Sequence, residues 1–465
     1  MTLGQRALVT ACAATGTTER ATRRLGAGRF LPALFTQRYA NMGGLDAERF
    51  REQLDACRSF EDAAWCAYWD DIADAELGQA REILGRLDEA AAPAPVPAPA
   101  PLSLEGDGAV EVLTATIAPY ARLLADHALL PPPAAVARFS EAHADRSVGE
   151  RAANVVELVS ALLRAITYLQ VSAFPGTTAG RMRAYERSRA LFDTLASAFA
   201  AGLDTIVEQV VIPTGGETVR GYRCLPAGAA SCPVVIVTNG LEGTVQELLI
   251  PLLRYHASGL GVVVMEMPGS YAYAGRMSPA SESVYRGVID AVVADPRVDA
   301  RRVGMVGVSF GGYWAARMAA ADDRLACVVA CGAPTHRSFR PTLGLPEIII
   351  DALAHVTGAT TPPGLLRRLR ALSLRGRYGE ITQPLLVING DHDTLLSTRD
   401  SVDLAAGAAN AELLLYPGDD HCAMGHYREW LDTSQRWLAE HLLDGSPADT
   451  SGSPFTREPT KKERR

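Results

Sequence analysis

A serine between two glycines is the residue of this sequence best suited to chemistry. Ser309 lies in Gly307-Val308-Ser309-Phe310-Gly311, after an apolar run and before an alanine-rich segment. Strand, sharp turn and helix are the context in which a G-x-S-x-G pattern forms a nucleophile elbow. The turn exposes the hydroxyl, and the glycines allow the backbone to approach closely. The pattern therefore predicts that Ser309 is a nucleophile.

A nucleophilic serine needs a general base, and the base needs a carboxylate to orient it. Asp393 follows the apolar run 384–388, and His421 follows the later run 413–416. Loops at the carboxyl ends of parallel strands face one crevice of a sheet. Serine, acid and histidine also occur here in the chain order of α/β-hydrolases. We therefore predict Asp393 as the acid and His421 as the base.

Nearby residues leave alternatives open for both partners. Asp391 is the rival acid, although a turn-shaping role suits it better. His392 adjoins the acid but stands on the wrong side of it in the chain order. His426 lies one helical turn beyond the predicted base and is expected to be a surface or packing residue. Cys422 follows the base directly, but nothing in the sequence marks it as a nucleophile.

Two backbone amides are expected to form an oxyanion hole. The residue after the nucleophile supplies one amide, which here is the N–H of Phe310. The other comes from the loop after an earlier strand, residues 238–244, where Gly240 and Gly243 permit close backbone approach. Leu241 is the best candidate to donate its N–H from this loop. An ordinary connection between a strand and a helix remains the alternative.

Weaker candidates for substrate contacts are four polar side chains: Glu242, Tyr271, His336 and Glu347. Taken singly, each also suits a structural role. The eight cysteines are scattered, without C-x-x-C and without zinc-type spacing to histidines. We therefore expect neither a metal ion nor an organic cofactor.

The periodicity of apolar residues divides the chain into two parts. Helical patterns extend over residues 26–203, interrupted by the alternating Ala/Pro stretch 90–101, which favours an extended spacer. Over residues 204–444, short apolar strands alternate with helical segments, which indicates a mostly parallel sheet covered on both faces. Residues 333–380 are too long for a simple crossover and are predicted to form a short helical cap. The expected fold is an α/β-hydrolase with an N-terminal all-helical domain.

Composition limits the partners and the compartment. The 465 residues are 48% hydrophobic with a net charge of −8, which suits a large core and gives no sign of nucleic-acid binding. No apolar run reaches the roughly 18 residues of a membrane span, and the apolar start is too short for a signal peptide. We expect residues 1–25 to be frayed and residues 445–465 to be disordered. The expectation is a cytoplasmic protein with a small-molecule substrate and no membrane partner.

Taken together, these motifs resemble the fermentation/respiration-switch-like branch of the α/β-hydrolases. The resemblance covers residues from about 150 to 445, and more faintly 28–88, and is carried by segments 239–244, 267–269, 295–299, 307–311, 390–393 and 419–422. This branch resembles esterases, the dihydroxypseudooxynicotine C–C hydrolase and a fungal hydrolase that shortens a pigment polyketide. The resemblance implies a helical domain that closes over the site, and often a homodimer.

The resemblance also implies which reactions to consider. Some relatives cleave C–C bonds with an added carboxylate in the cavity, for which Glu347 is the candidate here. The sequence departs from this branch at residues 267–271 and in an insertion up to about residue 148. Both departures lie where they can reshape the pocket. We expect a serine hydrolase acting on an ester or on a β-diketone or polyketide-like molecule in secondary metabolism. Acyl transfer or cyclisation, or a non-catalytic binding role on the same fold, are the alternatives.

Overall fold

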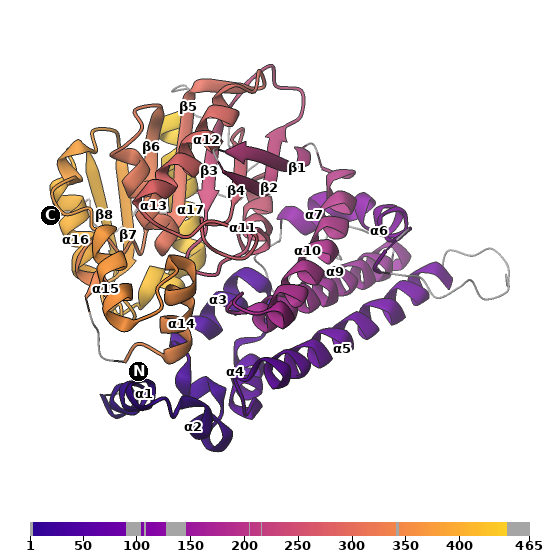
Figure 1. Ribbon diagram of the computed structural model, residues 1–465. Helices are drawn as coiled ribbons and strands as arrows, with labels where there is room; N and C mark the ends of the chain where they lie inside the picture. The colour runs from indigo at the N-terminus through magenta and orange to yellow at the C-terminus, as the bar shows by residue number, and fades with distance from the viewer. Residues whose placement is uncertain are drawn as a thin grey trace, which may run out of the picture.

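The computed structural model describes residues 3–89, 104–106, 108–126, 146–203, 205–214, 216–340 and 344–443. The predicted Ala/Pro spacer and the predicted C-terminal tail lie outside these residues. The division of the chain into domains therefore stays a prediction at those boundaries. Figure 1 shows helices on one side and a twisted sheet with its covering helices on the other.

The described chain before the first strand is helical and is here called the helical domain. Its helices are α1 (Leu3–Thr15), α2 (Thr18–Leu25), α3 (Ala33–Gly43), α4 (Ala47–Ala56), α5 (Asp62–Glu89), α6 (Ala109–Ile117), α7 (Ala121–Asp126), α9 (Arg146–Ala173) and α10 (Ala179–Ala200), with 3₁₀ turns η1 (Ala27–Phe30) and η2 (Ala118–Tyr120). Asp46 caps α4 by accepting the Arg49 N–H. Trp65 and Trp69 of α5 are fully buried, so the aromatic positions of that helix form a core.

Residues 3–25 are not frayed, and that prediction is wrong. They form α1 and α2, and Val9 of α1 is buried against Phe30. Thr10 of the same helix accepts the Gly344 N–H at 2.8 Å. This partner lies 334 positions away, so the composition of the segment could not reveal what stabilises it.

Helix α9 is long and apolar enough, over Gly149–Ala173, to cross a membrane by composition alone. Within the protein, 67% of that apolar window is buried. Leu158 and Leu162 belong to the same core as Trp65 and Trp69 of α5. The apolar character of the helix is therefore accounted for by packing inside the helical domain.

In the described residues, eight strands form one sheet in the order β1-β2-β4-β3-β5-β6-β7-β8. The strands are β1 (Thr205–Thr214), β2 (Glu217–Pro226), β3 (Cys232–Thr238), β4 (Gly261–Met265), β5 (Val298–Val308), β6 (Leu325–Cys331), β7 (Leu385–Gly390) and β8 (Ala411–Tyr416). β2 is antiparallel to both β1 and β4, and all other neighbours are parallel. This is the predicted mostly parallel sheet of an α/β-hydrolase.

Helices cover both faces of this sheet. The covering helices are α11 (Val245–Leu252), α12 (Glu282–Val293), α13 (Phe310–Ala319), α16 (Thr398–Gly407) and α17 (Tyr427–Leu442), with 3₁₀ turns η3 (Leu253–Tyr255), η4 (Pro279–Ser281) and η7 (His421–His426). Val235 of β3 packs in the core that contains α11 and α17, whereas Ile236 packs in the core that contains α12 and α13. Successive side chains of a strand point to opposite faces, so β3 is buried on both sides.

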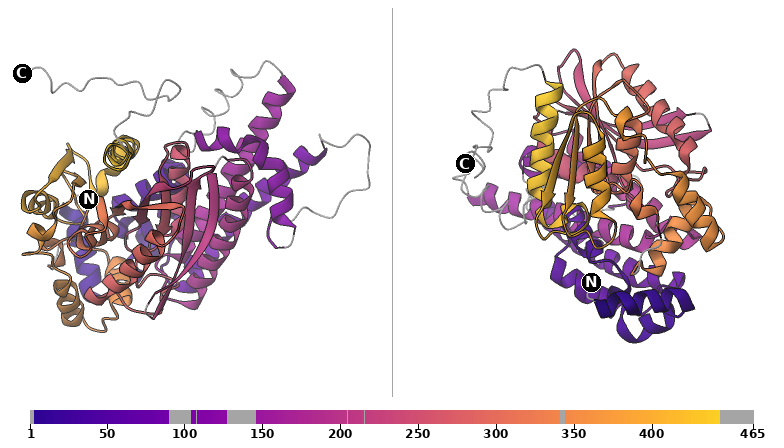
Figure 2. Two further views of the ribbon diagram at one scale, coloured as in Figure 1. Left: turned by 90° about the horizontal axis from the view of Figure 1, so that it is seen from above. Right: turned by 90° about the vertical axis from the view of Figure 1, so that its left-hand side faces the viewer.

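The core under α11 and α17 continues into the helical domain. The same cluster contains Val235 of the sheet and Trp65 of α5. Figure 2 shows the long helices of this domain packed along one side of the sheet. Burial of one shared apolar surface therefore joins the two parts of the molecule.

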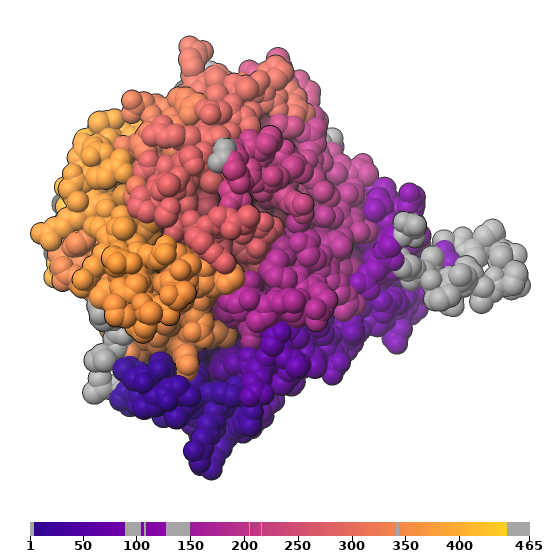
Figure 3. Space-filling model, in the orientation of Figure 1, coloured from indigo at the N-terminus to yellow at the C-terminus, as the bar shows by residue number. Residues whose placement is uncertain are grey.

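The segment between β6 and β7 forms the predicted cap. It contains η5 (Arg337–Phe339), α14 (Glu347–Thr357), α15 (Pro362–Ala371) and η6 (Tyr378–Glu380). The space-filling view shows the N-terminal helices directly against this cap (Figure 3). The cap and the helical domain thus meet over the carboxyl end of the sheet.

Candidate active site

Ser309 lies at the sharp turn between β5 and α13. Its backbone has φ 58° and ψ −121°, a combination that is strained for a residue with a side chain. A Cβ at Gly307 would lie 1.9 Å from the Gly311 carbonyl oxygen, and a Cβ at Gly311 would lie 2.3 Å from that of Thr238. Only glycine fits at these two positions, which explains the spacing of the motif.

Three side chains from three separate loops meet at this turn. His421 Nε2 lies 2.9 Å from Ser309 Oγ, and His421 Nδ1 lies 2.8 Å from Asp393 Oδ2. The side chains of His421 and Asp393 are both fully buried. With its proton on Nδ1, the imidazole can accept the hydroxyl proton at Nε2. The structure thus brings together the three residues predicted as nucleophile, base and acid.

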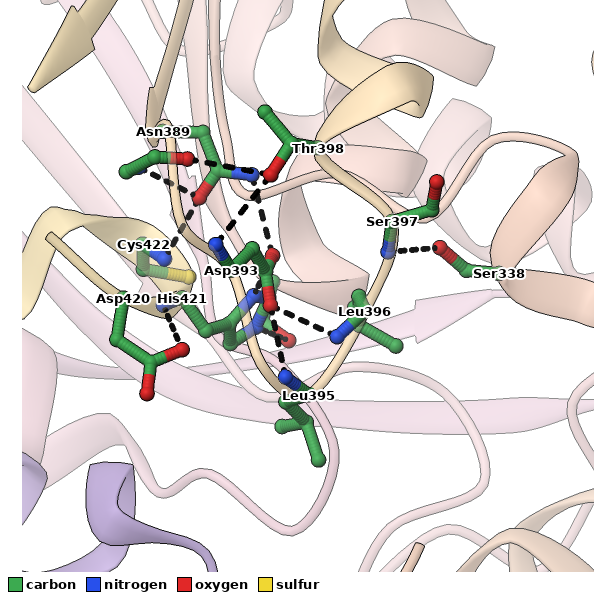
Figure 4. Close-up of polar contacts among 12 residues, drawn as sticks. Ser338, Asn389, Asp393, Leu395, Leu396, Ser397, Thr398, Asp420, His421 and Cys422 are labelled. Atoms are coloured by element: carbon green, nitrogen blue, oxygen red, sulfur yellow. Dashed lines mark hydrogen bonds and ion pairs between the residues drawn. The ribbon is translucent and has the colours of Figure 1, made fainter. Parts of the chain in front are cut away.

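The Asp393 carboxylate is held by several donors (Figure 4). Its Oδ1 accepts the N–H groups of Leu395 at 3.0 Å and Leu396 at 2.7 Å, and its Oδ2 accepts the Asn389 amide at 3.1 Å. Burial alone would raise the pKa of Asp393, but the His421 imidazole and these hydrogen bonds outweigh it and hold the pKa below its ordinary value. The carboxylate therefore stays ionised.

The loop that carries the histidine is tied to the loop that carries the acid. Asp420 accepts the N–H of His421 at 2.8 Å and the N–H of Thr394 at 2.6 Å.

Burial by itself would lower the pKa of His421, but the charge of Asp393 outweighs burial and raises that pKa well above its ordinary value. The imidazole is therefore a strong base in this environment.

The alternative candidates have other partners in the structure. Asp391 is exposed, and its carboxylate accepts the Gly418 N–H at 2.7 Å, as expected for a residue that shapes a turn. His426 Nδ1 lies 2.8 Å from Asp419 Oδ2. Cys422 is buried, and burial raises the pKa of its thiol well above the ordinary value. None of these three side chains is placed to replace the acid or the base.

The backbone of the loop after β3 lies against the nucleophile. Gly240 accepts the Gly243 N–H at 3.1 Å, which closes a turn with Leu241 inside it. A Cβ at Gly240 would lie 2.7 Å from Ser309 Cβ. Outside helices and strands, no backbone carbonyl of the described residues accepts the N–H of Leu241 or Phe310. Both amides are therefore available to an oxygen that develops negative charge.

Replacing Gly240 by alanine should lower kcat/KM by about 10²-fold, because the added Cβ would displace the loop that carries the Leu241 amide. Steady-state kinetics on a chromogenic ester would measure the loss, and thermal unfolding would show whether the variant is folded. Gly78 of α5 is a matched control, since a Cβ there meets nothing within 4 Å. Equal activity of Gly240→Ala and wild type would contradict this placement of the loop.

A cavity of 130 Å³ opens onto Ser309 and His421. Most of its apolar walls come from the helical domain, the cap and the loop after β7: Pro32, Leu34, Phe35, Met42, Phe174, Pro334, Phe339, Leu345, Ile349, Leu353, Leu369, Leu395 and Leu396. Arg38 and Arg340 also line it, but no described Asp or Glu does. Nor do the described residues contain a group of three or more His, Cys, Asp or Glu placed to hold a metal ion.

Glu242 and Tyr271 do not line this cavity, contrary to the expectation that they contact substrate. Glu242 has φ 53°, and its carboxylate accepts the Gly176 N–H at 2.7 Å. Burial raises the pKa of Glu242 to about 7. The Tyr271 hydroxyl donates to the Glu242 carbonyl at 3.1 Å. Both side chains therefore support the loop after β3 and do not face the cavity.

His336 and Glu347 also lie outside the described lining, although both belong to the cap. His336 Nδ1 lies 2.7 Å from the Ser373 hydroxyl, so the ring is used within the cap. Glu347 is the first residue of α14, while the cavity is lined by Ile349 and Leu353 of that helix. The sequence placed the cap correctly, but not which side of its helices faces the site.

Sequence reasoning missed three residues that position the site. Asn389 could have been noticed, because it is a polar residue at the end of a buried strand. The fully buried Asp400 accepts the Arg337 N–H at 2.7 Å and so holds the start of the cap. Arg38 bonds to Glu247, 209 positions away. No local pattern signals the last two, since their partners are distant in the sequence.

Comparisons with known proteins identify the family and the fold of this chain. Residues 143–443 match the family model described as Esterase FrsA-like. The chain is 25% identical over 268 residues to Esterase FrsA of Escherichia coli O81 (strain ED1a), which covers 55% of this chain and 64% of that protein. It is 24% identical over 252 residues to Esterase FrsA of Vibrio parahaemolyticus serotype O3:K6 (strain RIMD 2210633), covering 51% and 60%. The match thus spans less than two thirds of these curated relatives.

Solved structures extend the likeness to the helical domain. The 2,6-dihydroxy-pseudo-oxynicotine hydrolase superposes with a TM-score of 0.62 at 17% identity, over 89% of this chain and 97% of that one. AbyA5 superposes with a TM-score of 0.53 at 25% identity, over 63% and 86%. The first likeness, at its low identity, shows a shared fold that includes most of the chain.

Proposed function

The chain belongs to the esterase FrsA-like family of α/β-hydrolases, and we propose that it hydrolyses carboxylic esters with a small or medium-sized apolar acyl group. The observation that carries the proposal is the hydrogen-bonded series Asp393–His421–Ser309 at the floor of an apolar cavity. The cavity of 130 Å³ is close in size to one of about 150 Å³ that holds benzene in another protein. A compact apolar acyl group therefore fits this space.

The geometry supports a two-step acyl transfer to water. His421 takes the proton of Ser309 as Oγ attacks the ester carbonyl, and Asp393 holds the imidazole in the required tautomer. The amides of Leu241 and Phe310 stabilise the oxyanion, which typically contributes a factor of about 10²–10³ per donor. His421 then gives its proton to the departing alcohol. The same base activates the water that releases the acid from Ser309.

An ester suits this cavity better than a β-diketone. In the described lining there is no carboxylate that could play the part of the added cavity acid used by some relatives. Glu347, the residue suggested for that part, lies outside the lining. Secondary metabolism, a homodimer and a cytoplasmic location stay predictions.

Product analysis on a substrate panel tests the proposal. We expect p-nitrophenyl esters to yield free acid that carries one oxygen from labelled water. When an alcohol or amine acceptor is added, we expect no transfer of the acyl group to that acceptor. β-Diketones assayed in parallel should remain intact. If only the diketones were cleaved, the proposed activity would have to be C–C hydrolysis and not ester hydrolysis. Acyl transfer to the acceptor would instead favour a transferase, and an inert Ser309 towards a fluorophosphonate probe would favour a binding protein.

Replacing Leu353 of the cap by alanine should shift the acyl preference towards longer chains. Leu353 is 7% exposed and lines the cavity, so truncation would open space for added methylenes, each worth about 0.8 kcal/mol when buried. The ratio of kcat/KM for octanoate to that for butyrate should rise about fourfold or more. Leu365→Ala is the matched control, since Leu365 is a buried cap residue outside the lining. An unchanged ratio would place the acyl group elsewhere.

A further inference from the structure

We propose that Arg38 of the helical domain is a positioning residue for the oxyanion hole. Its guanidinium holds, from outside the α/β part of the molecule, the loop that offers the Leu241 amide to the substrate. The inference rests on the proposed function, because it concerns the same developing oxyanion. It adds a role for the helical domain in the rate of the reaction, beyond enclosing the cavity.

The guanidinium bonds to the loop at two points. Arg38 Nη2 donates to the carbonyl oxygen of Glu242 at 2.7 Å, and Glu242 directly follows Leu241. Arg38 Nε and Nη2 also donate to the two carboxylate oxygens of Glu247, each at 2.8 Å. Glu247 lies in the first turn of α11, the helix that begins where the loop ends. The planar Arg38 guanidinium thus connects the middle of the loop to its end.

These contacts are shielded from water. The Arg38 side chain is 14% exposed and that of Glu247 is 1% exposed. The guanidinium carbon lies 5.1 Å from the Tyr39 ring centroid and 6.0 Å from that of Phe174, within the range of cation–π attraction. Because breaking a buried, hydrogen-bonded ion pair is strongly destabilising, these contacts hold the Arg38 guanidinium in place.

The loop needs external support to keep its shape. Glu242 has φ 53°, a conformation that costs free energy in a residue other than glycine. Its carbonyl accepts from both Arg38 and the Tyr271 hydroxyl, and its carboxyl accepts the Gly176 N–H. Loss of the Arg38 contact would let the peptide group that carries the Glu242 carbonyl relax, and the Leu241 amide, two peptide groups earlier in the same loop, would move with it.

Arg38 also lines the cavity, so a role in substrate binding must be separated from a positioning role. An interaction made with bound substrate and transition state alike changes KM, whereas one that acts on the oxyanion donor changes kcat. Affinity for a ketone that forms a tetrahedral adduct should follow kcat. An alkyl trifluoromethyl ketone with the acyl chain of the preferred ester supplies this readout.

Arg38→Lys is the decisive variant. A lysine keeps a positive charge beside Glu247, but as a point donor it cannot bond the carboxylate and the Glu242 carbonyl with the same planar fork. We expect kcat to fall about tenfold or more and the inhibition constant of the trifluoromethyl ketone to rise by the same factor, with KM little changed.

The helical domain offers a matched control. Arg164 of α9 donates to Glu76 at 2.8 Å and to Gln79 at 3.3 Å. As with Arg38, the guanidinium forms an ion pair with a buried glutamate and also bonds a second group. Arg164→Lys therefore repeats the same chemical change at a place that does not touch the loop after β3. We expect it to lower the unfolding temperature while leaving kcat and the ketone affinity as in wild type.

The outcomes separate the explanations. A rise in KM alone for Arg38→Lys, or equal losses in Arg38→Lys and Arg164→Lys, would overturn the positioning role. Should Arg38→Lys not fold, Tyr271→Phe removes the other side-chain donor to the same carbonyl and is expected to lower kcat and ketone affinity together. A Tyr271→Phe enzyme with both unchanged would also overturn it. Failure of the proposed function is distinguishable, because wild type itself would then not hydrolyse the ester.

Discussion

Replacing Ser309 by alanine should lower kcat for ester hydrolysis by a factor on the order of 10⁶, since loss of the nucleophile costs about that much where a triad acts as a unit. The hydroxyl lies 2.9 Å from the only ring nitrogen of His421 that is not used by Asp393. Alanine leaves no atom that can form the acyl intermediate. A residual rate above that in water is still expected, from binding and the oxyanion donors.

Chromogenic ester assays, labelling by a fluorophosphonate probe and thermal unfolding would measure this effect together. Labelling should disappear in Ser309→Ala, and the unfolding temperature should stay near that of wild type. Ser197→Ala is a suitable control, because Ser197 is an exposed residue of α10 whose hydroxyl bonds only within its helix. Retention of substantial ester hydrolysis by Ser309→Ala would exclude the proposed mechanism.

Asp393→Asn is expected to lower kcat by about 10⁴-fold, the typical effect of removing the orienting carboxylate of a triad. His421 Nδ1–H donates a hydrogen bond to Asp393 Oδ2, at an N–O distance of 2.8 Å. An asparagine amide that turned its NH₂ group to this nitrogen would favour the other tautomer, with a proton on Nε2. That nitrogen could then no longer take the proton of Ser309.

The pH dependence provides a second signature of the same variant. Asp393 raises the pKa of His421, and activity requires the unprotonated imidazole. Activity should therefore be lost as the pH falls through the His421 pKa. Without the negative charge this pKa falls, so the residual activity of Asp393→Asn should persist to lower pH. Profiles of kcat/KM against pH would show the shift.

Asp391→Asn is the matched control for this prediction. Asp391 is two residues away, exposed, and bonded to the Gly418 N–H. Its conversion to asparagine keeps an oxygen that can accept that hydrogen bond. We expect kcat and its pH profile to remain as in wild type. A larger loss from Asp391→Asn than from Asp393→Asn would reverse the assignment of the acid.

Local sequence patterns were sufficient where the physical cause is itself local. The elbow could be predicted because Gly307 and Gly311 are required by contacts within the turn and with the strand beside it. The strands with both faces buried could be predicted because nearly every residue must then be apolar, as in β3, where only the last residue, Thr238, is polar. The cap could be predicted because residues 333–380 are too long for a simple crossover, and α14 and α15 lie within this segment.

Predictions failed where partners distant in the sequence decide the outcome. Residues 3–25 looked frayed, yet Thr10 of α1 bonds to Gly344 of the cap. Glu242 was expected to contact substrate, but its carboxylate accepts the N–H of Gly176, 66 positions away.

The sequence by itself determined the chemistry that this protein can offer: a serine on a glycine-flanked turn, followed by an acid and a histidine at the ends of later strands. Those features are encoded by short patterns, because strand burial and turn sterics act over a few residues. Tertiary structure was needed to establish that Asp393, which the sequence favoured, meets His421 and that its rival Asp391 does not. It alone placed Arg38 on the loop after β3. Both depend on how separate elements pack, and packing is set by shape and burial across the whole molecule.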